Sequence, residues 1–287
     1  MLIFFLLRPV EALAASRRGL TIWFEQLLPA LLPFSILSYI ILQSNLFSGK
    51  KRRLGKIPPE EWYVIVCGFL FGFPIGSKLT ADLCRQRKLS ETRAQWLFIL
   101  TNNFSPVFVT TVFTGLLGIS PGICTYALLY GLPFVLCVLA LHILPGSSCT
   151  SKKNTASRFQ LNMQIVDAGI LNGFETLIKI CGYVILFSLT AECLRMMPLV
   201  HPLVKTVLIG CTEVTTGMAE LSGITDSSLV YILAVWFLSW GGISGLFQTA
   251  SITAGTDLSM RRYLAVRLAL SGVSVLSAIL YCACVLR

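Results

Sequence analysis

Long apolar segments separated by short polar loops make up nearly the whole chain. The segments lie at residues 21–42, 62–89, 90–117, 123–144, 174–194, 202–221, 227–254 and 263–285. A helix of about 20 residues covers the hydrocarbon core of a bilayer, and most of these segments reach that length. A short amphipathic helix is expected before them at residues 9–18, with a counterpart at 167–173. The pattern predicts an all-α polytopic membrane protein with a single membrane domain, residues 1–287.

Four of the apolar segments are interrupted in the middle by glycine, proline and small polar residues. The interruptions read Phe71-Gly-Phe-Pro-Ile-Gly76, Thr101-Asn-Asn-Phe-Ser-Pro106, Cys211-Thr-Glu-Val-Thr-Thr-Gly217 and Ser239-Trp-Gly-Gly-Ile-Ser244. In a membrane, backbone leaves the helix only where protein or a polar cavity satisfies the freed N–H and C=O groups. Paired broken helices in the two halves of a chain are the sequence feature that best locates a transporter's binding site.

The interruptions recur in the same order, which predicts an internal repeat. Ala81-Asp-Leu83 matches Ala219-Glu-Leu221 at an offset of 138 residues, and Ser105-Pro-Val-Phe108 matches Ser244-Gly-Leu-Phe247 at an offset of 139. We expect a first repeat at residues 9–150 and a second at residues 160–287, with a polar connection near residue 155 between them.

The distribution of lysine and arginine predicts the topology of these repeats. If residues 62–89 form a re-entrant hairpin, one membrane face receives the basic residues of 50–56, 85–93, 152–158 and 261–262. That face then holds 14 basic residues against 6 on the other face, as the positive-inside rule requires. Each repeat then crosses the membrane three times, so the second repeat is inverted relative to the first. Hairpin tips are expected at residues 73–76 and 213–217, and spans that unwind midway at 102–106 and 241–244.

Composition excludes several classes of protein. The chain is 55% hydrophobic and 13% charged, whereas soluble domains carry about 25% charged residues. The net charge of +10 follows from basic loops, so no nucleic acid is expected as a partner. The ten cysteines lie mostly in apolar segments, where cysteine acts as a small hydrophobe, and no metal site is expected. Without a phosphate-binding loop or a nucleophile with its base, we expect no enzyme.

The first hairpin tip supplies candidate binding residues. Gly72, Pro74 and Gly76 permit a tight turn and free backbone groups for a ligand, and the alternative is a kink within one span. Lys78 and Asp82 are four residues apart, so they share a helix face as an intramembrane charge pair. Charges inside apolar segments usually mark a functional site. Here a structural pair is the favoured interpretation, because the two residues can simply pair with each other.

The two mid-span breaks supply polar groups beside unwound backbone. Asn102, Asn103 and Ser105 carry amides and a hydroxyl that suit Na⁺ or a polar solute. The alternative is that these side chains only cap the two half-helices. The second break offers a similar set one repeat later, namely Gly241, Gly242, Ser244 and Gln248.

Glu213 is the strongest single candidate for contact with a substrate or a coupling ion, either Na⁺ or H⁺. It lies at the second hairpin tip beside Thr215 and Thr216, and a carboxylate in an apolar segment is costly unless it has a use. The alternative is a glutamate near the membrane interface.

Three motifs together resemble the nucleoside-recognition (Gate) domain proteins, and among them the sporulation integral membrane proteins of the YlbJ type. The motifs are the run from Gly72 to Asp82, the Asn102-Asn-Phe-Ser-Pro106 break and Trp240-Gly-Gly-Ile-Ser244. The resemblance covers about residues 19–270. It implies a fold like the core of concentrative nucleoside transporters, with two hairpins and two broken helices, and a role in endospore formation.

Together these features predict a multi-pass protein of the bacterial cell membrane. We expect a secondary transporter or permease of a small polar solute, nucleoside-like or other, that serves endospore formation. The alternative is a non-transporting scaffold or assembly factor for the spore envelope, its cortex or coat. The expected partners are the lipid bilayer and the solute, and a homo-oligomer is left open.

Overall fold

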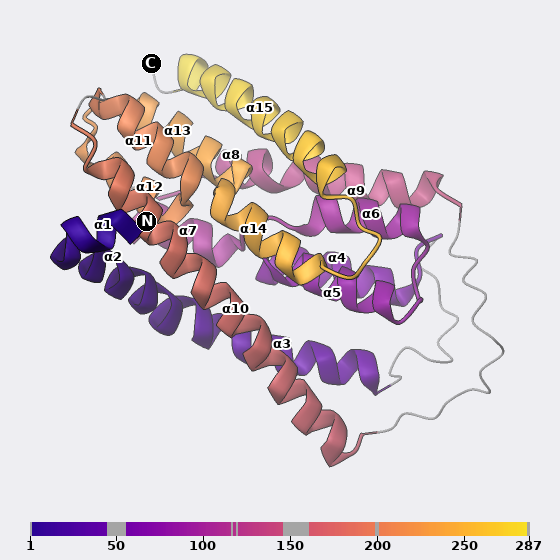
Figure 1. Cartoon of the computed structure of the whole chain (residues 1–287). Helices are drawn as coiled ribbons and strands as arrows, with labels where there is room; N and C mark the ends of the chain where they lie inside the picture. The colour runs from indigo at the N-terminus through magenta and orange to yellow at the C-terminus, as the bar shows by residue number, and fades with distance from the viewer. Residues whose placement is uncertain are drawn as a thin grey trace.

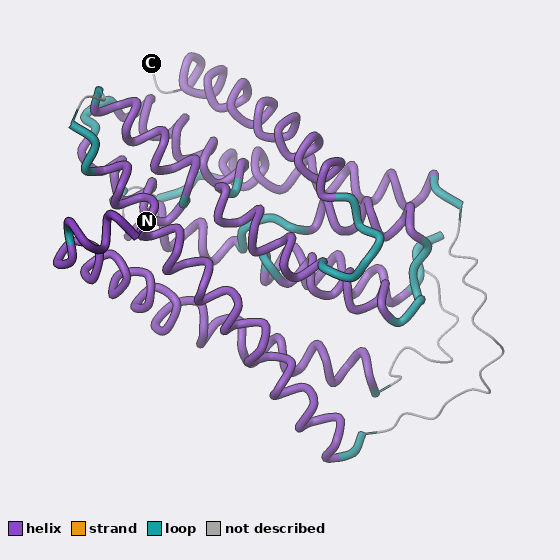
Figure 2. The backbone as a smooth tube through the Cα atoms, in the orientation of Figure 1, coloured by secondary structure: helices purple, strands orange, loops and turns teal. Residues whose placement is uncertain are grey.

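The computed structural model describes residues 2–44, 56–115, 117–118, 120–145, 161–198 and 201–285, and helices dominate this part of the chain, which contains no strand (Figures 1 and 2). The first half contains α1 (Leu2–Leu7), α2 (Pro9–Ile22), the π-helical turn η1 (Trp23–Leu27), α3 (Leu28–Gln43), α4 (Pro59–Phe71), α5 (Ile75–Arg85), α6 (Glu91–Thr101), α7 (Pro106–Gly115), α8 (Ile123–Tyr126), η2 (Ala127–Gly131) and α9 (Leu132–Ile143). The second half contains α10 (Met163–Arg195), α11 (Pro202–Thr212), α12 (Val214–Glu220), η3 (Leu221–Gly223), α13 (Ser227–Trp240), α14 (Gly242–Thr253) and α15 (Met260–Val285).

The described helices include five that are long and apolar enough to cross a membrane. These are Glu91–Gly115, Ile123–Ile143, Met163–Arg195, Ser227–Thr253 and Met260–Cys284, and a sixth is present if Pro9–Glu25 and Leu28–Gln43 form one bent span. Many large apolar side chains on α10 and α15 are exposed, among them Leu171, Ile178, Leu276 and Leu280, as lipid-facing positions require. The predicted all-α polytopic membrane protein is confirmed.

The four sequence interruptions produce two different structures. At the first and third, the chain folds back, so that α4 packs against α5 and α11 packs against α12 as helical hairpins. At the second and fourth, the chain runs on, so that α6 with α7 and α13 with α14 each form one interrupted span. Figure 2 shows short loops midway along the bundle where these interruptions lie.

The two hairpins have their open ends toward opposite ends of α10. In the N-terminal half of α10, Asn172 accepts from Lys78 of α5 (2.7 Å), and Arg85 at the open end of the first hairpin borders a cavity with Asn172 and Glu175 and donates to the Ile252 carbonyl near the end of α14 (2.7 Å). At the C-terminal end of α10, Arg195 pairs with Glu220 at the end of α12 (2.6 Å). The hairpin tips therefore approach each other inside the bundle from opposite directions.

The first span differs from the predicted continuous helix of residues 21–42. Instead, α2 continues through the π-helical turn and the axis bends by 48° before α3. Pro29, near the start of α3, explains the bend, because proline lacks an N–H and its ring clashes with the carbonyl four residues earlier. The approach expected at 167–173 is likewise not separate, since it merges with the following span into the 33-residue helix α10.

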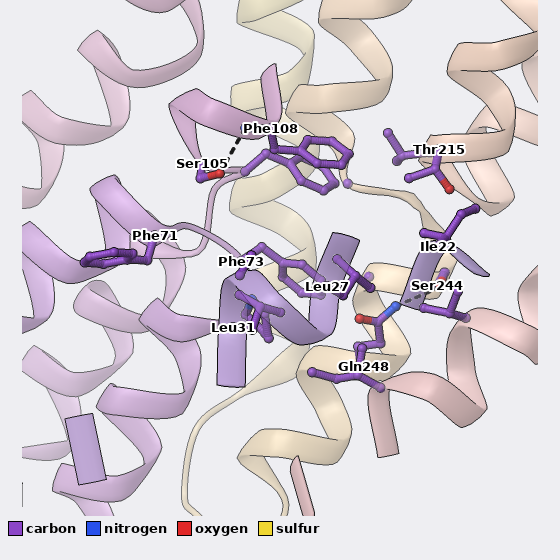
Figure 3. A pocket seen from close by; sticks show the side chains of 18 of the residues that line it. Ile22, Leu27, Leu31, Phe71, Phe73, Ser105, Phe108, Thr215, Ser244 and Gln248 are labelled. Atoms are coloured by element: carbon purple, nitrogen blue, oxygen red, sulfur yellow. Dashed lines mark hydrogen bonds between the residues drawn. The ribbon is translucent and has the colours of Figure 1, made fainter. Parts of the chain in front are cut away.

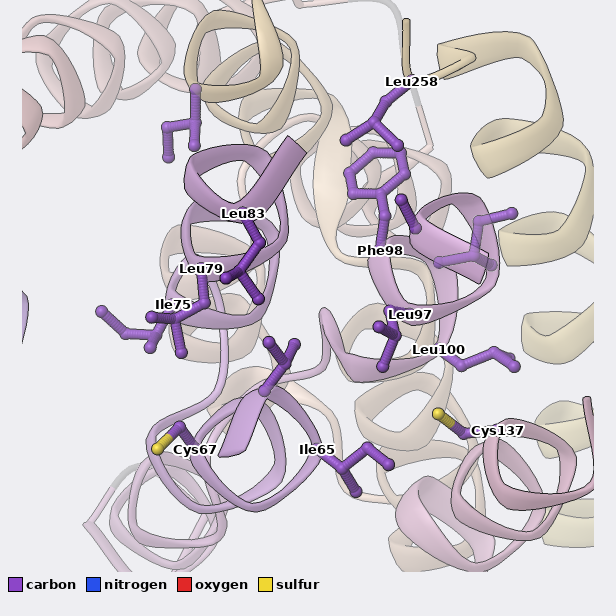
Figure 4. Close-up of a cluster of buried hydrophobic side chains, with 14 of the residues drawn as sticks. Ile65, Cys67, Ile75, Leu79, Leu83, Leu97, Phe98, Leu100, Cys137 and Leu258 are labelled. Atoms are coloured by element: carbon purple, nitrogen blue, oxygen red, sulfur yellow. The ribbon is translucent and has the colours of Figure 1, made fainter. Parts of the chain in front are cut away.

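A large apolar core packs α4, α5, α6 and α9 together (Figure 4). Leu79 and Leu83 of α5 face Leu97 and Phe98 of α6 across this core, and all four side chains are fully buried. The core anchors the first hairpin to the first interrupted span, so the position of the hairpin tip is set by packing along its whole length.

A buried ion pair crosses the edge of this core. Arg93 Nε donates to Glu61 Oε1 (2.7 Å), Arg93 Nη2 also pairs with Glu61 Oε2, and Arg93 Nη1 donates to the Leu141 carbonyl (2.7 Å). Arg93 was counted above among the basic loop residues of 85–93, and that assignment is wrong because the side chain is fully buried. Of the basic loops at 50–56 and 152–158, all but Lys56 lie outside the described residues.

Candidate functional site

A cavity of about 430 Å³ lies where the two hairpin tips and the two mid-span breaks meet (Figure 3). The first tip contributes Phe73 and Pro74, and the first break contributes Phe104 and Ser105. The second tip contributes Glu213, Val214 and Thr215, and the second break contributes Gly241, Ser244, Gly245 and Gln248. The bend between α2 and α3 and the middle of α10 close the remaining walls with Leu27, Leu31, Ile180 and Val184.

Glycine allows the first tip to lie directly on the first break. Gly72 has a φ of +70°, and a Cβ there would lie 2.3 Å from the Ser105 nitrogen. A Cβ on Gly76 would lie 2.4 Å from the Thr101 carbonyl oxygen. The Phe73 amide donates to the Asn103 carbonyl (2.5 Å), and the Phe73–Pro74 peptide bond is cis. Gly72 and Gly76 therefore shape the site from behind, while Phe73 and Pro74 face the cavity.

The two asparagines of the first break hydrogen-bond with protein rather than lining the cavity. Asn102 donates to Thr249 (3.1 Å) and Tyr263 (2.9 Å), and its oxygen accepts from Ser77 (3.0 Å). Asn103 donates to the Leu100 carbonyl (2.7 Å). Both side chains are buried, so Asn102 joins three other segments of the bundle at the break.

Ser105 is the member of this set that lines the cavity. Its hydroxyl accepts from the Phe108 amide (3.1 Å) and so caps the start of α7. A serine hydroxyl retains a proton to donate and a second lone pair, which leaves Ser105 able to contact a ligand while it caps the helix.

Glu213 is the N-cap residue of α12 and is buried. Its carboxylate accepts from the Thr215 amide (3.1 Å) and hydroxyl (2.5 Å), and from the Thr216 amide and hydroxyl (both 2.7 Å). All four partners donate hydrogen bonds to the carboxylate, which caps α12 and is thereby held in place at the second tip. Glu213 and Thr215 line the cavity, whereas Thr216 supports Glu213 from outside it.

The second break is tighter than the first. Only Gly241 lies outside the two half-helices, and both Gly241 (φ +88°) and Gly242 (φ +73°) have left-handed backbone. Gly242 packs against the second tip, because a Cβ there would lie 3.3 Å from the Thr212 carbonyl oxygen. Gln248 lies one turn further on and donates to Ser244 (2.9 Å), and both side chains line the cavity.

Lys78 and Asp82 lie away from this cavity. Their ion pair is formed (3.0 Å), and Lys78 also donates to Asn172 of α10 (2.7 Å). Both residues border a second, polar cavity of about 400 Å³ beside the N-terminal half of α10, together with Arg85, Glu175 and Lys179. The structural interpretation of this pair is therefore the better supported one.

The cavity wall is mostly apolar and aromatic. Phe104 and Phe108 stack with ring centroids 4.8 Å apart, and Phe73 lies beside Phe104 with centroids 6.0 Å apart. Glu213 is the one charged side chain among the described residues that line the cavity. The arrangement offers a flat apolar surface on one side and hydroxyl, amide and carboxylate groups on the other.

Arg267 of α15 was missed in the sequence interpretation. It is buried and donates to the Asn102 carbonyl (3.1 Å), the Asn103 side-chain oxygen (2.7 Å) and the Trp240 carbonyl (3.3 Å). It therefore holds both breaks, although it does not line the cavity. An arginine inside an apolar span was a signal of function in its own right. The aromatic residues Phe73, Phe104 and Phe108 were also missed, because nothing in their spacing separates them from core residues.

No metal centre is visible in the part of the chain that the structure describes, since no three His, Cys, Asp or Glu side chains converge there. The oxygens that a monovalent cation would need are instead the backbone carbonyls at the breaks, and Arg267 already donates to two of them, those of Asn102 and Trp240.

Comparison with known proteins gives one informative relative. No protein-family model and no solved structure matches the chain, so the Gate-domain part of the resemblance stays a prediction. The chain is 28% identical to the sporulation integral membrane protein YlbJ of Bacillus subtilis (strain 168), over 92% of this chain and 76% of that protein. With its candidate spans, the chain is a multi-pass membrane protein of the bacterial cell membrane that is similar, over most of its length, to a sporulation integral membrane protein.

Proposed function

We propose that this chain is a secondary transporter or permease of a small solute that carries a flat apolar ring and polar groups. The observation that carries the proposal is the convergence of four interruptions from distant parts of the sequence on one cavity. Non-helical backbone at membrane depth is tolerated where it is buried in protein or lines a cavity, and broken helices that meet in this way form the substrate sites of secondary transporters.

The cavity wall supports a nucleoside-like solute. A volume of about 430 Å³ lies within the range of small-molecule sites, which are mostly apolar with a few polar groups that fix orientation. The stacked Phe104 and Phe108 suit a planar ring, and Ser244 and Gln248 suit hydroxyl groups. Glu213 favours a neutral or cationic solute over an anionic one, and it is the residue on which H⁺ coupling would act.

Alternating access would follow from an inverted repeat. The order of hairpin, interrupted span and continuous span occurs in α4–α9 and again in α11–α15, and the open end of the first hairpin lies beside the N-terminal half of α10, whereas that of the second lies at its C-terminal end. This arrangement supports two inverted repeats, at residues 9–150 and 160–287, each with a re-entrant hairpin. Rocking one repeat against the other would then open the cavity to each side in turn.

Cysteine accessibility tests the topology. In a cysteine-light background, Gln86→Cys probes the open end of the first hairpin and Ser222→Cys probes the open end of the second, where Ser222 is exposed. Because the basic end is expected inside, an impermeant maleimide added to intact cells should label Ser222→Cys at once and Gln86→Cys only after permeabilisation. Labelling of both from the same side would contradict the inverted repeat.

Binding and uptake test the transport proposal. Purified protein is screened by thermal shift against nucleosides, nucleobases and amino acids, and each hit is followed as uptake into proteoliposomes. We expect Glu213→Gln to weaken binding of a hit about tenfold, because one charge-assisted hydrogen bond contributes about 1.5 kcal/mol. Asp226→Asn is the matched control, since Asp226 caps α13 in the same way but is exposed and outside the cavity.

A role in sporulation is part of the same proposal and rests on the relative's name. It is tested by deleting the gene in its host and complementing with the Glu213→Gln variant. If spores form normally with this variant and no solute binds, the chain acts as a scaffold or assembly factor for the spore envelope rather than as a transporter.

A further inference from the structure

The guanidinium of Arg267 lies between the C-terminal ends of two half-helices. Its partners at α6 are the Asn102 carbonyl (3.1 Å) and the Asn103 side-chain oxygen (2.7 Å). Its partners at α13 are the Trp240 carbonyl (3.3 Å) and the Leu238 carbonyl (3.5 Å). The residue is 3% exposed, so these oxygens take the place of water around the charge.

Electrostatics explains why a cation belongs at this position. The last carbonyls of a helix have no intrahelical partner, and the aligned peptide dipoles give that end a partial negative charge. Two such ends meet here, because Arg267 donates to oxygens at the end of α6 and at the end of α13. Within the described residues, Arg267 forms no ion pair with a carboxylate, so the helix ends and the Asn103 amide are the groups that offset its charge.

Oxygens of this kind bind the coupling cation in transporters with broken helices. There, unwound carbonyls and the C-terminal ends of half-helices coordinate Na⁺ or H⁺. In this chain the planar fork of Arg267 already donates to oxygens of both breaks. A Na⁺ added beside it would meet a like charge at close range in a poorly solvated site.

We propose that Arg267 is a built-in cation that replaces a coupling Na⁺ between the breaks of the two interrupted spans, so that the binding-competent structure forms without Na⁺. The inference rests on the proposed function, because only a transporter has a coupling ion. Arg267 is a positioning residue: it acts on the cavity through the first break, where Phe104 and Ser105 follow Asn103, and through the second, where Gly241 follows Trp240.

Thermal melting of the purified full-length protein tests this proposal without any solute. For the unaltered protein we expect the same melting temperature in NaCl and in choline chloride at equal ionic strength. Arg267→Ala should melt several degrees lower, and millimolar methylguanidinium should restore at least half of that loss. Arg267→Lys, which keeps the charge but not the planar fork, should fall between the two. Arg261→Ala, on the exposed side of the same helix, should have the melting temperature of the unaltered protein, and methylguanidinium should not change it.

Three results would overturn the proposal. The first is a higher melting temperature of the unaltered protein in Na⁺ than in choline. The second is an Arg267→Ala variant with the melting temperature of the unaltered protein. The third is a methylguanidinium effect that raises the melting temperature of Arg267→Ala no more than that of Arg261→Ala. If Arg267→Ala does not accumulate, the proposal is still tested by the melting temperature of the unaltered protein in Na⁺ and in choline, and by the melting temperature of Arg267→Lys. Absence of solute uptake would remove the proposed function but leave these melting results intact, so the two failures are distinguishable.

Discussion

We expect Gly72→Ala to lower the free energy of unfolding by about 3–5 kcal/mol and to abolish solute binding in the central cavity. Two costs combine at this position. Gly72 has a φ of +70° and a ψ of −156°, a backbone region that essentially only glycine occupies, so an alanine there costs about 1–3 kcal/mol. Its Cβ would also lie 2.3 Å from the Ser105 nitrogen and 2.7 Å from the Asn103 carbonyl oxygen, so the first hairpin tip must move away from the first break.

Gly255→Ala separates these two costs. Gly255 also has a positive φ, +75°, but a Cβ there would meet nothing within 4 Å. This control should show the cost of an alanine at a positive φ without the close contact, and it should keep its solute binding. Chemical denaturation of both variants in detergent, with thermal shift by a bound solute, makes the comparison. Equal losses of stability in the two variants would show that the contact between tip and break contributes nothing.

The interruptions were predictable because their signals are local. Glycine at Gly72, Gly241 and Gly242 supplies backbone with a positive φ, Pro74 is the N-cap residue of α5, and Pro106 is the first residue of α7. A single segment carries such signals whatever it packs against. In the structure α4 packs against α5 and α11 packs against α12, while the re-entrant topology that charge counting predicts stays a prediction.

The direction in which a polar side chain points was not predictable from the segment that carries it. Asn102 looked equally able to bind a solute or to cap a helix. Its outcome depends on Ser77, Thr249 and Tyr263, which come from three other segments. The position of Glu213 was easier to predict, because its hydrogen-bond partners are its sequence neighbours Thr215 and Thr216. Such local partners can be recognised in the sequence.

Charges in apolar surroundings were the least predictable feature. Arg93 stands close to the basic loop that ends at Lys88, so counting by position places it in water, although it is buried against Glu61. Arg267 lies well inside a span and yet was not weighed. In both cases the compensating groups are far away in sequence, and a long basic side chain reveals its partner only when the helices are packed.

The second large effect is expected at the buried pair of Arg93 and Glu61. Arg93→Met should lower the free energy of unfolding by about 3–5 kcal/mol, because removing one member of a buried pair leaves the other charge without its compensation. The side chains of Arg93 and Glu61 are 1% and 0% exposed. Arg93 also donates to the Leu141 and Leu144 carbonyls (2.7 and 3.2 Å) at the end of α9, so α4, α6 and α9 lose a shared contact.

The double variant Glu61→Leu with Arg93→Met tests whether charge compensation or packing causes that loss. Replacing both members of a buried pair with apolar residues of similar size is often neutral, so we expect most of the lost stability to return. Lys179→Met is the matched control, because its pair with Glu175 has the same kind of contact (2.7 Å) but side chains that are 51% and 65% exposed, and exposed pairs contribute little. Denaturant titration of the four proteins measures this directly. A double variant as unstable as Arg93→Met would mean that the α9 carbonyls, rather than the carboxylate, are the partners that matter.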